Sequence, residues 1–226
     1  MCRLLASCAG AGLDLAPWMR SFRSVCATSK EYQGHGWGVA WIEGGEWRRH
    51  RSLDPIWEDS FVPPPSQLAL VHARSAFQNR NIEVENNMPF LGERFAFGFN
   101  GELRGVRLRT PGETGAARLH ALTERFGREE ATDPARVLQR LDAVTQARSA
   151  YVRALNVVIC DGRALYAHCR FGEDPDYFTL HRAKLAGVGR GEVICSEPLV
   201  DLEVETKWRP FENGETYRTQ EVSPCS

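Results

Sequence analysis

The pattern of apolar and polar positions predicts that strands make up most of the chain. Phe95, Phe97 and Phe99 fall on one face at period two, which is typical of a strand with one buried side. Turn residues at 43–46 and the Asp-Gly pair at 161–162 predict two hairpins. Apolar runs bounded by polar residues predict strands at 2–8, 36–42, 47–53, 68–73, 94–99, 152–160, 163–170, 192–197 and 216–222.

Three segments have helical periodicity instead. Apolar residues recur at spacings of three and four over 18–26 and 119–126. The third helix has the clearest start, with Asp133 as the N-cap and Pro134 as the first helical residue. Its apolar stripe consists of Val137, Leu138, Leu141 and Val144.

The order of these elements predicts the fold class. Strands and helices are grouped along the chain rather than alternating, which argues against a doubly wound parallel sheet. Two sheets with helices outside them, an α+β arrangement, suit this order. The Pro-rich stretch 62–66 is too short to link two domains, so we expect a single domain over residues 2–226.

Composition and charge exclude several classes of partner. The 226 residues are 42% hydrophobic and 25% charged, an ordinary balance for a globular protein. The formal net charge is −1 and there is no long basic run, so neither nucleic acid nor an anionic membrane is an expected partner. No apolar stretch is long enough to span a bilayer or to act as a secretory signal, so we expect a cytoplasmic protein.

The cysteines and histidines give no sign of a metal site. The cysteines lie at positions 2, 8, 26, 160, 169, 195 and 225, an odd number without a C-x-x-C pair. This argues against a disulfide framework and against a common zinc site. The six histidines are scattered, and no H-E-x-x-H occurs. We therefore expect neither a metal nor another cofactor.

Cys2 directly follows Met1, and two interpretations of this position are open. Cys2 could be a small apolar residue at the start of the first strand. Alternatively, Met1 is removed, and Cys2 then carries a thiol and a free α-amine on one residue, which makes a nucleophile with its own base. The unperturbed pKa of such an amine is about 8, so a modest shift makes it neutral near pH 7.

Two further stretches carry groups suited to acyl chemistry. The amide of Asn100 and the backbone N–H of Gly101 can converge on one oxygen, although Asn-Gly is also a common hairpin turn. His72 and Arg74 share one face at the end of a strand. Arginine is suited to binding a carboxylate through two parallel hydrogen bonds, although it is also common on surfaces at strand ends.

The order of the motifs points to a family. After Cys2 the chain reads GHGWGVAW, VHARSAF, ENNMPF, FAFGFNGEL and finally CSEPL. From Met1 to about Trp208 this ordered set resembles the class II glutamine amidotransferases, which are N-terminal-nucleophile hydrolases. It is similar above all to the small stand-alone members that begin M-C-R-L-L. The resemblance implies a four-layer αββα sandwich of two mostly antiparallel sheets.

The resemblance also implies roles for individual residues. Cys2 would attack a γ-carboxamide while its own amine relays the proton, and Asn100 and Gly101 would form the oxyanion hole. Arg74, the arginine of the H-x-R motif, would bind the α-carboxylate of glutamine. His72 and Ser75, which belong to the same stretch, are expected to contribute to substrate binding.

The chain departs from the family pattern at four positions near the inferred pocket. Met88 and Phe99 stand where family members commonly have histidine, and Phe77 stands in place of threonine. Gly115 occupies the position of the acid that holds the α-amino group of glutamine. A buried ammonium without a carboxylate partner is costly. Free glutamine is therefore expected to be a poor substrate.

The leading hypothesis is an amidohydrolase that cleaves a γ-glutamyl-type amide through a thioester on Cys2. One alternative is a glutaminase that supplies ammonia to a separate synthetase, with Glu113 or Glu102 compensating for Gly115. A second alternative is a catalytically silent binding subunit. A small-molecule amide is the expected ligand in the first two cases.

Overall fold

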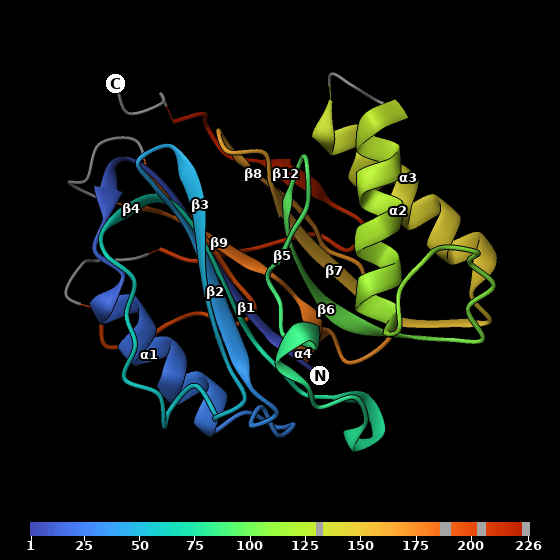
Figure 1. Ribbon diagram of the computed structural model, residues 1–226, viewed down its shortest axis with the longest axis horizontal. Helices are drawn as coiled ribbons and strands as arrows, with labels where there is room; N and C mark the ends of the chain where they lie inside the picture. Colours follow the sequence, from blue (N-terminus) through green and yellow to red (C-terminus); the bar gives the residue numbers. More distant parts are fainter. Residues whose placement is uncertain (130–132, 186–190, 203–206, 223–226) are drawn as a thin grey trace.

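Two antiparallel sheets lie face to face in the computed structural model of the protein, which describes residues 1–129, 133–185, 191–202 and 207–222 (Figure 1). The first sheet has the strand order β11-β9-β10-β1-β4-β2-β3. Its strands are β1 (Arg3–Leu13), β2 (Trp37–Glu43), β3 (Glu46–Ser52), β4 (Ser66–Ala73), β9 (His181–Leu185), β10 (Gly191–Cys195) and β11 (Arg209–Pro210).

The second sheet has the order β12-β8-β7-β6-β5. Its strands are β5 (Phe90–Leu91), β6 (Ala96–Arg104), β7 (Tyr151–Cys160), β8 (Leu165–His168) and β12 (Thr216–Arg218). All the expected strands are therefore present in whole or in part. Three short strands were not expected, namely β5, β9 and β11.

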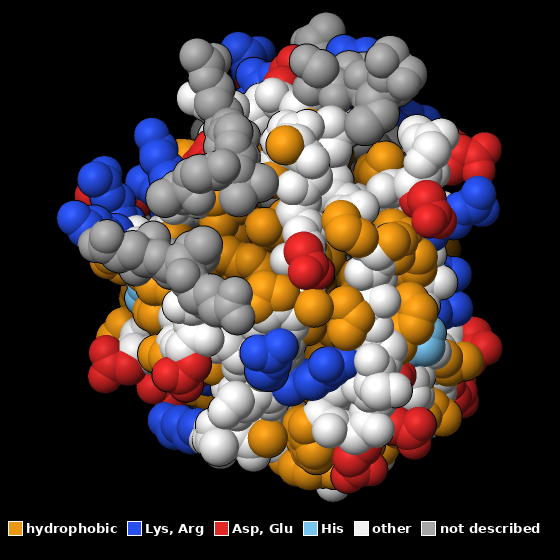
Figure 2. All heavy atoms as spheres, turned by 90° about the vertical axis from the view of Figure 1, so that its left-hand side faces the viewer, with side chains coloured by type: hydrophobic (Ala, Val, Ile, Leu, Met, Phe, Trp, Pro, Cys, Tyr) orange, Lys and Arg blue, Asp and Glu red, His pale blue; other side chains and the backbone are white. Residues whose placement is uncertain are grey.

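Helices cover the outer face of each sheet. Helix α1 (Ala16–Ala27) packs Trp18 and Phe22 against one sheet, while α2 (Gly115–Glu129) and α3 (Pro134–Arg148) cover the other. The predicted four-layer αββα sandwich is thus confirmed. Figure 2 shows the face on the side of α1, where apolar side chains gather near the middle and charged side chains lie mostly around them.

Three shorter helical segments complete the described elements. They are α4 (Pro175–Phe178) and two 3₁₀ turns at Phe77–Asn79 and Val84–Asn86. Both 3₁₀ turns belong to the connection between β4 and β5. This connection starts at the end of β4, where Ala73 pairs with Arg3 and the N-terminus of the chain lies.

Local signals in the sequence explain several of these elements. The carboxylate of Asp133 accepts a hydrogen bond from the backbone N–H of Ala135 at 3.0 Å, which confirms the predicted N-cap of α3. Between β2 and β3 the chain turns at Gly44 and Gly45, whose φ angles are +60° and +79°. Positive φ at both positions is what a two-residue hairpin turn requires, so the predicted hairpin is also confirmed.

Side-chain alternation along β1 separates two layers of core. Leu5 faces α1, whereas Leu4 faces the space between the sheets and meets residues of β6 and β7 such as Ala96 and Val158. A Cβ on Gly98 of β6 would lie 2.9 Å from Cδ2 of Leu4, so the two sheets touch closely there. This contact sets the position of β1 relative to β6 near the N-terminus.

All six cysteines in the described part of the chain are free and buried, and Cys225 lies outside the described residues. None of the described helices is long and apolar enough to cross a membrane. Within the same residues, no cluster of three or more His, Cys, Asp or Glu side chains could hold a metal ion.

Candidate active site

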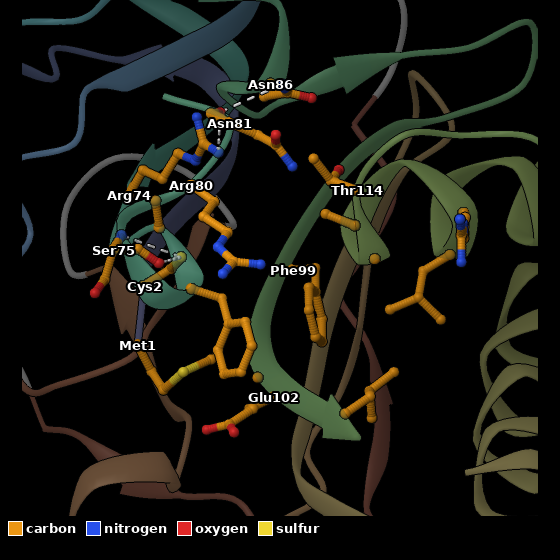
Figure 3. Close-up of a pocket in the computed structure, with 18 of the residues that line it drawn as sticks. Met1, Cys2, Arg74, Ser75, Arg80, Asn81, Asn86, Phe99, Glu102 and Thr114 are labelled. Atoms are coloured by element: carbon orange, nitrogen blue, oxygen red, sulfur yellow. Dashed lines mark hydrogen bonds between the residues drawn. The ribbon is translucent and has the colours of Figure 1, made fainter. Parts of the chain in front are cut away.

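A cavity of about 480 Å³ opens beside Cys2 (Figure 3). Cavities of this size accommodate small-molecule ligands. Its walls come from the N-terminus of the chain, the segment 74–88, the end of β6 with the loop that follows it, and the start of α2. Among the residues with predicted roles, Cys2, Arg74, Ser75 and Gly101 line it.

The thiol of Cys2 is buried and held by the backbone of Ser75. The Ser75 N–H donates to Sγ at 3.4 Å, and Sγ lies 3.7 Å from the Ser75 carbonyl oxygen, to which the thiol donates. Burial raises the pKa of the Cys2 thiol, although the N-terminal amine, the Ser75 N–H and Arg74 act in the opposite direction. The thiol is therefore protonated at neutral pH, and attack on a carbonyl needs a base that removes its proton.

Met1 is held at the cavity by three residues from two other parts of the chain, Glu31 and Gln33 in one and Tyr177 in the other. Its ammonium forms an ion pair with Glu31, and its carbonyl oxygen accepts hydrogen bonds from Gln33 Nε2 and, at 2.8 Å, from the Tyr177 hydroxyl. In this form the nitrogen of Cys2 belongs to an amide and cannot act as a base. Sequence reasoning did not find these three residues, because Tyr177 is 176 positions from Met1 and no motif marks it.

Glu31 remains a carboxylate at neutral pH. Burial works to raise its pKa, but the N-terminal ammonium and Arg153 prevail, and the pKa lies below its ordinary value. Arg153 Nη1 is 2.9 Å from Glu31 Oε1 and 3.5 Å from Glu102 Oε2. Glu102 also pairs with Arg104 at 2.5 Å. Both acids at this end of the cavity are therefore already matched by cations.

Asn100 and Gly101 lie within β6, where they pair with Asn156 and Leu155 of β7. The hairpin-turn interpretation is therefore excluded, and the strand runs on to Arg104 instead of ending at Phe99. Gly101 is required by packing, because a Cβ there would lie 2.0 Å from the carbonyl oxygen of Ala154.

The side-chain amide of Asn100 is fully buried, and neither its nitrogen nor its oxygen has a hydrogen-bond partner in the described part of the chain. Buried amides are nearly always hydrogen-bonded, so this exception needs a reason. Leu4 of β1 meets Gly98 of β6. Asn100 stands two residues after Gly98 on the same side of β6, and Cys2 stands two residues before Leu4, next to the start of β1. The unpartnered amide thus lies on the side of β6 that faces the start of β1.

Arg74 is buried in the cavity wall, and three of its N–H groups are bound within the protein. Nη2 donates to the Asn81 carbonyl at 2.6 Å, and Nη1 donates to the Glu83 carbonyl at 3.3 Å and to Asn87 Oδ1 at 3.1 Å. A guanidinium has five N–H groups. Nε–H and one Nη2–H remain, so Arg74 both braces the segment 81–87 and keeps two donors for a ligand.

His72 lies outside the cavity. It is completely buried, and its Nε2 is 3.2 Å from the carbonyl oxygen of Phe99. Burial lowers the pKa of His72 to about 3, so the ring is neutral and donates through Nε2–H to that carbonyl. This position supports a role in joining β4 to β6 rather than in touching a ligand.

The four positions that depart from the family pattern all line the cavity. Met88 and Phe99 are buried in its wall, whereas Phe77 is 54% exposed. Gly115 is the first residue of α2, and a Cβ added there would have no atom within 4 Å. Open space therefore replaces the acid that the family pattern has at this position.

The two stacked antiparallel sheets between outer helices form a fold that the chain shares with solved glutamine amidotransferase structures. The resemblance read from the motifs is confirmed at the level of the fold. No protein-family model matches the chain, and no curated protein matches it either.

Three solved structures are similar to the chain over nearly all its length. A glutamine aminotransferase class-II domain protein from Silicibacter pomeroyi has a TM-score of 0.64 and 19% identity, covering 99% of this chain and 100% of its own. Glutamine phosphoribosylpyrophosphate amidotransferase from B. subtilis, solved with ADP and GMP, has a TM-score of 0.66 and 16% identity, covering 96% and 46%. A predicted glutamine amidotransferase from Pseudomonas aeruginosa has a TM-score of 0.53 and 20% identity, covering 96% and 92%.

Proposed function

We propose that this protein is an N-terminal-cysteine amidohydrolase that cleaves a γ-glutamyl-type amide through a thioester on Cys2. The observation that carries the proposal is the buried, unpartnered amide of Asn100. Asn100 stands in β6 between Phe99 and Gly101, which line a ligand-sized cavity together with Cys2. A donor without a protein partner is available to an oxygen that enters with the substrate.

The reaction requires that Met1 be removed. The α-amine of Cys2 is then free, and it is the nearest base to the thiol because both belong to one residue. The space that Met1 leaves is bordered by Glu31, Gln33 and Tyr177, which bind Met1 in the unprocessed chain.

Acylation begins when Sγ of Cys2 forms a bond to the amide carbon and the α-amine takes the thiol proton. The carbonyl oxygen becomes an oxyanion, which the Asn100 amide and the Gly101 N–H stabilise. The oxyanion collapses, the C–N bond breaks, and the ammonium returns the proton to the leaving nitrogen. Water then attacks the thioester with the amine as its base, which releases a carboxylic acid and regenerates the thiol.

Arg74 and Ser75 contribute to binding in this proposal. The Ser75 N–H holds the sulfur and favours its anionic form. Arg74 faces the substrate with the two N–H groups that the segment 81–87 does not use. A substrate carboxylate is the natural partner of a guanidinium at this place.

A glutaminase that supplies ammonia to a separate synthetase is the alternative. It requires an acid for the α-ammonium of glutamine. Glu102 is occupied by Arg104 and Arg153, and Gly115 has no side chain. Glu113 is the remaining acid in the cavity wall, and it is exposed. The pocket therefore favours an amide without a free α-amine over glutamine itself.

The proposal is tested by a screen of γ-glutamyl amides, including glutamine, with the processed chain and with its Cys2→Ala variant. Hydrolysis of at least one amide is expected, and it should disappear with Cys2→Ala. A diazo-ketone analogue of glutamine should label Cys2 if glutamine itself is accepted. Hydrolysis that survives in the Cys2→Ala variant, or none with any amide, contradicts the proposal.

A further inference from the structure

Arg80 enters the same cavity from the segment 74–88, and it was not singled out by the sequence motifs. Figure 3 shows its side chain directed into the cavity between Arg74 and Phe99. The guanidinium of Arg80 has no hydrogen bond or ion pair with any residue that the structure describes. It is thus a cation at the site whose donors are all available.

The backbone on both sides of Arg80 has an unusual conformation. Gln78, Asn79 and Asn81 have φ angles of +53°, +54° and +53°, a conformation that residues other than glycine rarely adopt. Arg74 donates to the carbonyl oxygens of Asn81, the residue after Arg80, and of Glu83, three residues after Arg80. Arg74 therefore holds in place the turn that carries Arg80.

The other charged side chains of the cavity wall, apart from Arg74, either have a partner within the protein or lie away from Arg80. Arg118 Nε donates to the Gly112 carbonyl at 2.9 Å, and Glu102 is paired with Arg104 and Arg153. Glu113 is exposed on the opposite wall, beside the start of α2. No described acid is bound to Arg80, so its charge is open to an anion from outside the protein.

Much of the remaining wall is apolar. Met88, Phe99, Leu103, Val106, Leu108 and Leu119 line it. Charge-assisted hydrogen bonds gain strength where water is displaced by such surfaces. The combination suits a ligand with an apolar body and one anionic end.

We propose that Arg80 completes a carboxylate-binding site with Arg74, so that the substrate is an amide with a carboxylate on an apolar body. The inference rests on the proposed function for the reacting end of the substrate. Within the part of the chain that the structure describes, Arg74 has only two free N–H groups, because the other three bind Asn81, Glu83 and Asn87. In that same part, Arg80 has all five N–H groups of its planar guanidinium free for a carboxylate. Arg80 is thus a specificity residue, and Arg74 is in part its positioning residue.

The test uses two probes that differ in one charge. Glutaric acid mono-4-nitroanilide carries a carboxylate, and its methyl ester is neutral. Binding of both is measured by calorimetry with the Cys2→Ala chain, with and without Arg80→Gln. We expect Arg80→Gln to weaken binding of the acid at least tenfold and to leave binding of the ester within twofold. Arg80→Lys should restore part of the affinity for the acid.

The matched control is Arg107→Gln, which removes an exposed positive charge from the loop beside the cavity without touching its wall. It should leave both affinities unchanged. Equal affinity for the acid with and without Arg80, or no binding of the acid at all, overturns the inference. If the wild-type chain hydrolyses neither probe while the acid still binds through Arg80, the proposed reaction fails and the assignment of Arg80 stands.

Discussion

The backbone N–H of Ser75 donates to the sulfur of Cys2 across 3.4 Å. Ser75 follows β4 and Cys2 precedes β1, and these strands pair antiparallel with Arg3 opposite Ala73. The ladder therefore brings the N-terminus beside the segment that begins with Arg74. The same backbone pairing that builds the sheet places the thiol, its hydrogen-bond donor and a cation at one cavity wall.

The first prediction concerns the reactivity of Cys2 in the chain that retains Met1. Burial raises the pKa of the thiol above its ordinary value of 9.0, so the thiolate fraction is small at pH 7 and grows only as the pH passes 9. The rate of alkylation by iodoacetamide, followed by mass spectrometry of the Cys2 peptide, should still rise between pH 9 and 10. Cys195, whose pKa burial raises to about 12, is the internal control and should react more slowly. A rate that levels off below pH 9 contradicts this prediction.

The second prediction concerns processing. A chain with a cleavable extension before Cys2 should be inactive until a site-specific protease exposes Cys2, because the α-amine is the proposed base. Intact mass and amide hydrolysis are measured before and after cleavage. Full activity with Met1 or the extension still attached would contradict a mechanism in which the α-amine of Cys2 is the base.

The third prediction concerns Asn100. Asn100→Ala should lower turnover by roughly 100- to 1000-fold, the usual effect of removing one oxyanion donor. The melting temperature should change little, because the amide of Asn100 has no hydrogen-bond partner among the described residues.

Asn156 is the matched control, since it lies opposite Asn100 in the ladder. Its amide donates to the Phe178 carbonyl and accepts from the Arg170 N–H, so Asn156→Ala should lower the melting temperature. The turnover of the folded variant should stay close to that of wild type. The assignment of Asn100 fails if Asn100→Ala lowers stability and leaves turnover unchanged.

The fourth prediction concerns Arg74. Arg74→Lys should lower kcat/KM on the best substrate at least tenfold, because an ammonium cannot donate to Asn81, Glu83 and Asn87 and also reach a carboxylate. Amide hydrogen exchange should also become faster over residues 81–87, where the bracing is lost. Unchanged kcat/KM would show that Arg74 has no part in binding.

The fifth prediction concerns Gly115. An aspartate fits there, because a Cβ has no atom within 4 Å and the φ angle is outside the left-handed region. Wild type should prefer N-acetylglutamine or the deaminated analogue to glutamine. Gly115→Asp should raise kcat/KM on glutamine by roughly ten- to a hundredfold. One charge-assisted hydrogen bond contributes about 1.5–3 kcal/mol, which corresponds to a rate ratio of this size.

Gly115→Ala is the control for the fifth prediction, since it adds a Cβ without a charge. It should leave the preference for the analogue unchanged. Efficient hydrolysis of glutamine by wild type, with rejection of the analogue, would show that another residue holds the ammonium.

Local features of the sequence determined most of the elements. The Asp133 cap, the Gly44-Gly45 hairpin and the alternation of Phe95, Phe97 and Phe99 each depend on residues close together in the chain. Such signals hold wherever the segment is packed. Strand β9 was missed because its inward residues are only Ala183 and Leu185, between exposed or half-exposed basic residues. Two apolar positions are too few to reveal a period of two.

The tertiary structure decided what the sequence left open at the site. The pair Asn100-Gly101 suits a turn or a strand, and pairing with β7 made it a strand. The roles of Arg74 and Arg80 depend on how the segment 74–88 folds back on itself. Met1 is held by Gln33 and Tyr177, which are 32 and 176 positions away from Met1 in the sequence. Contacts over such separations leave no local pattern, because they arise only when the sheets and their connections pack together.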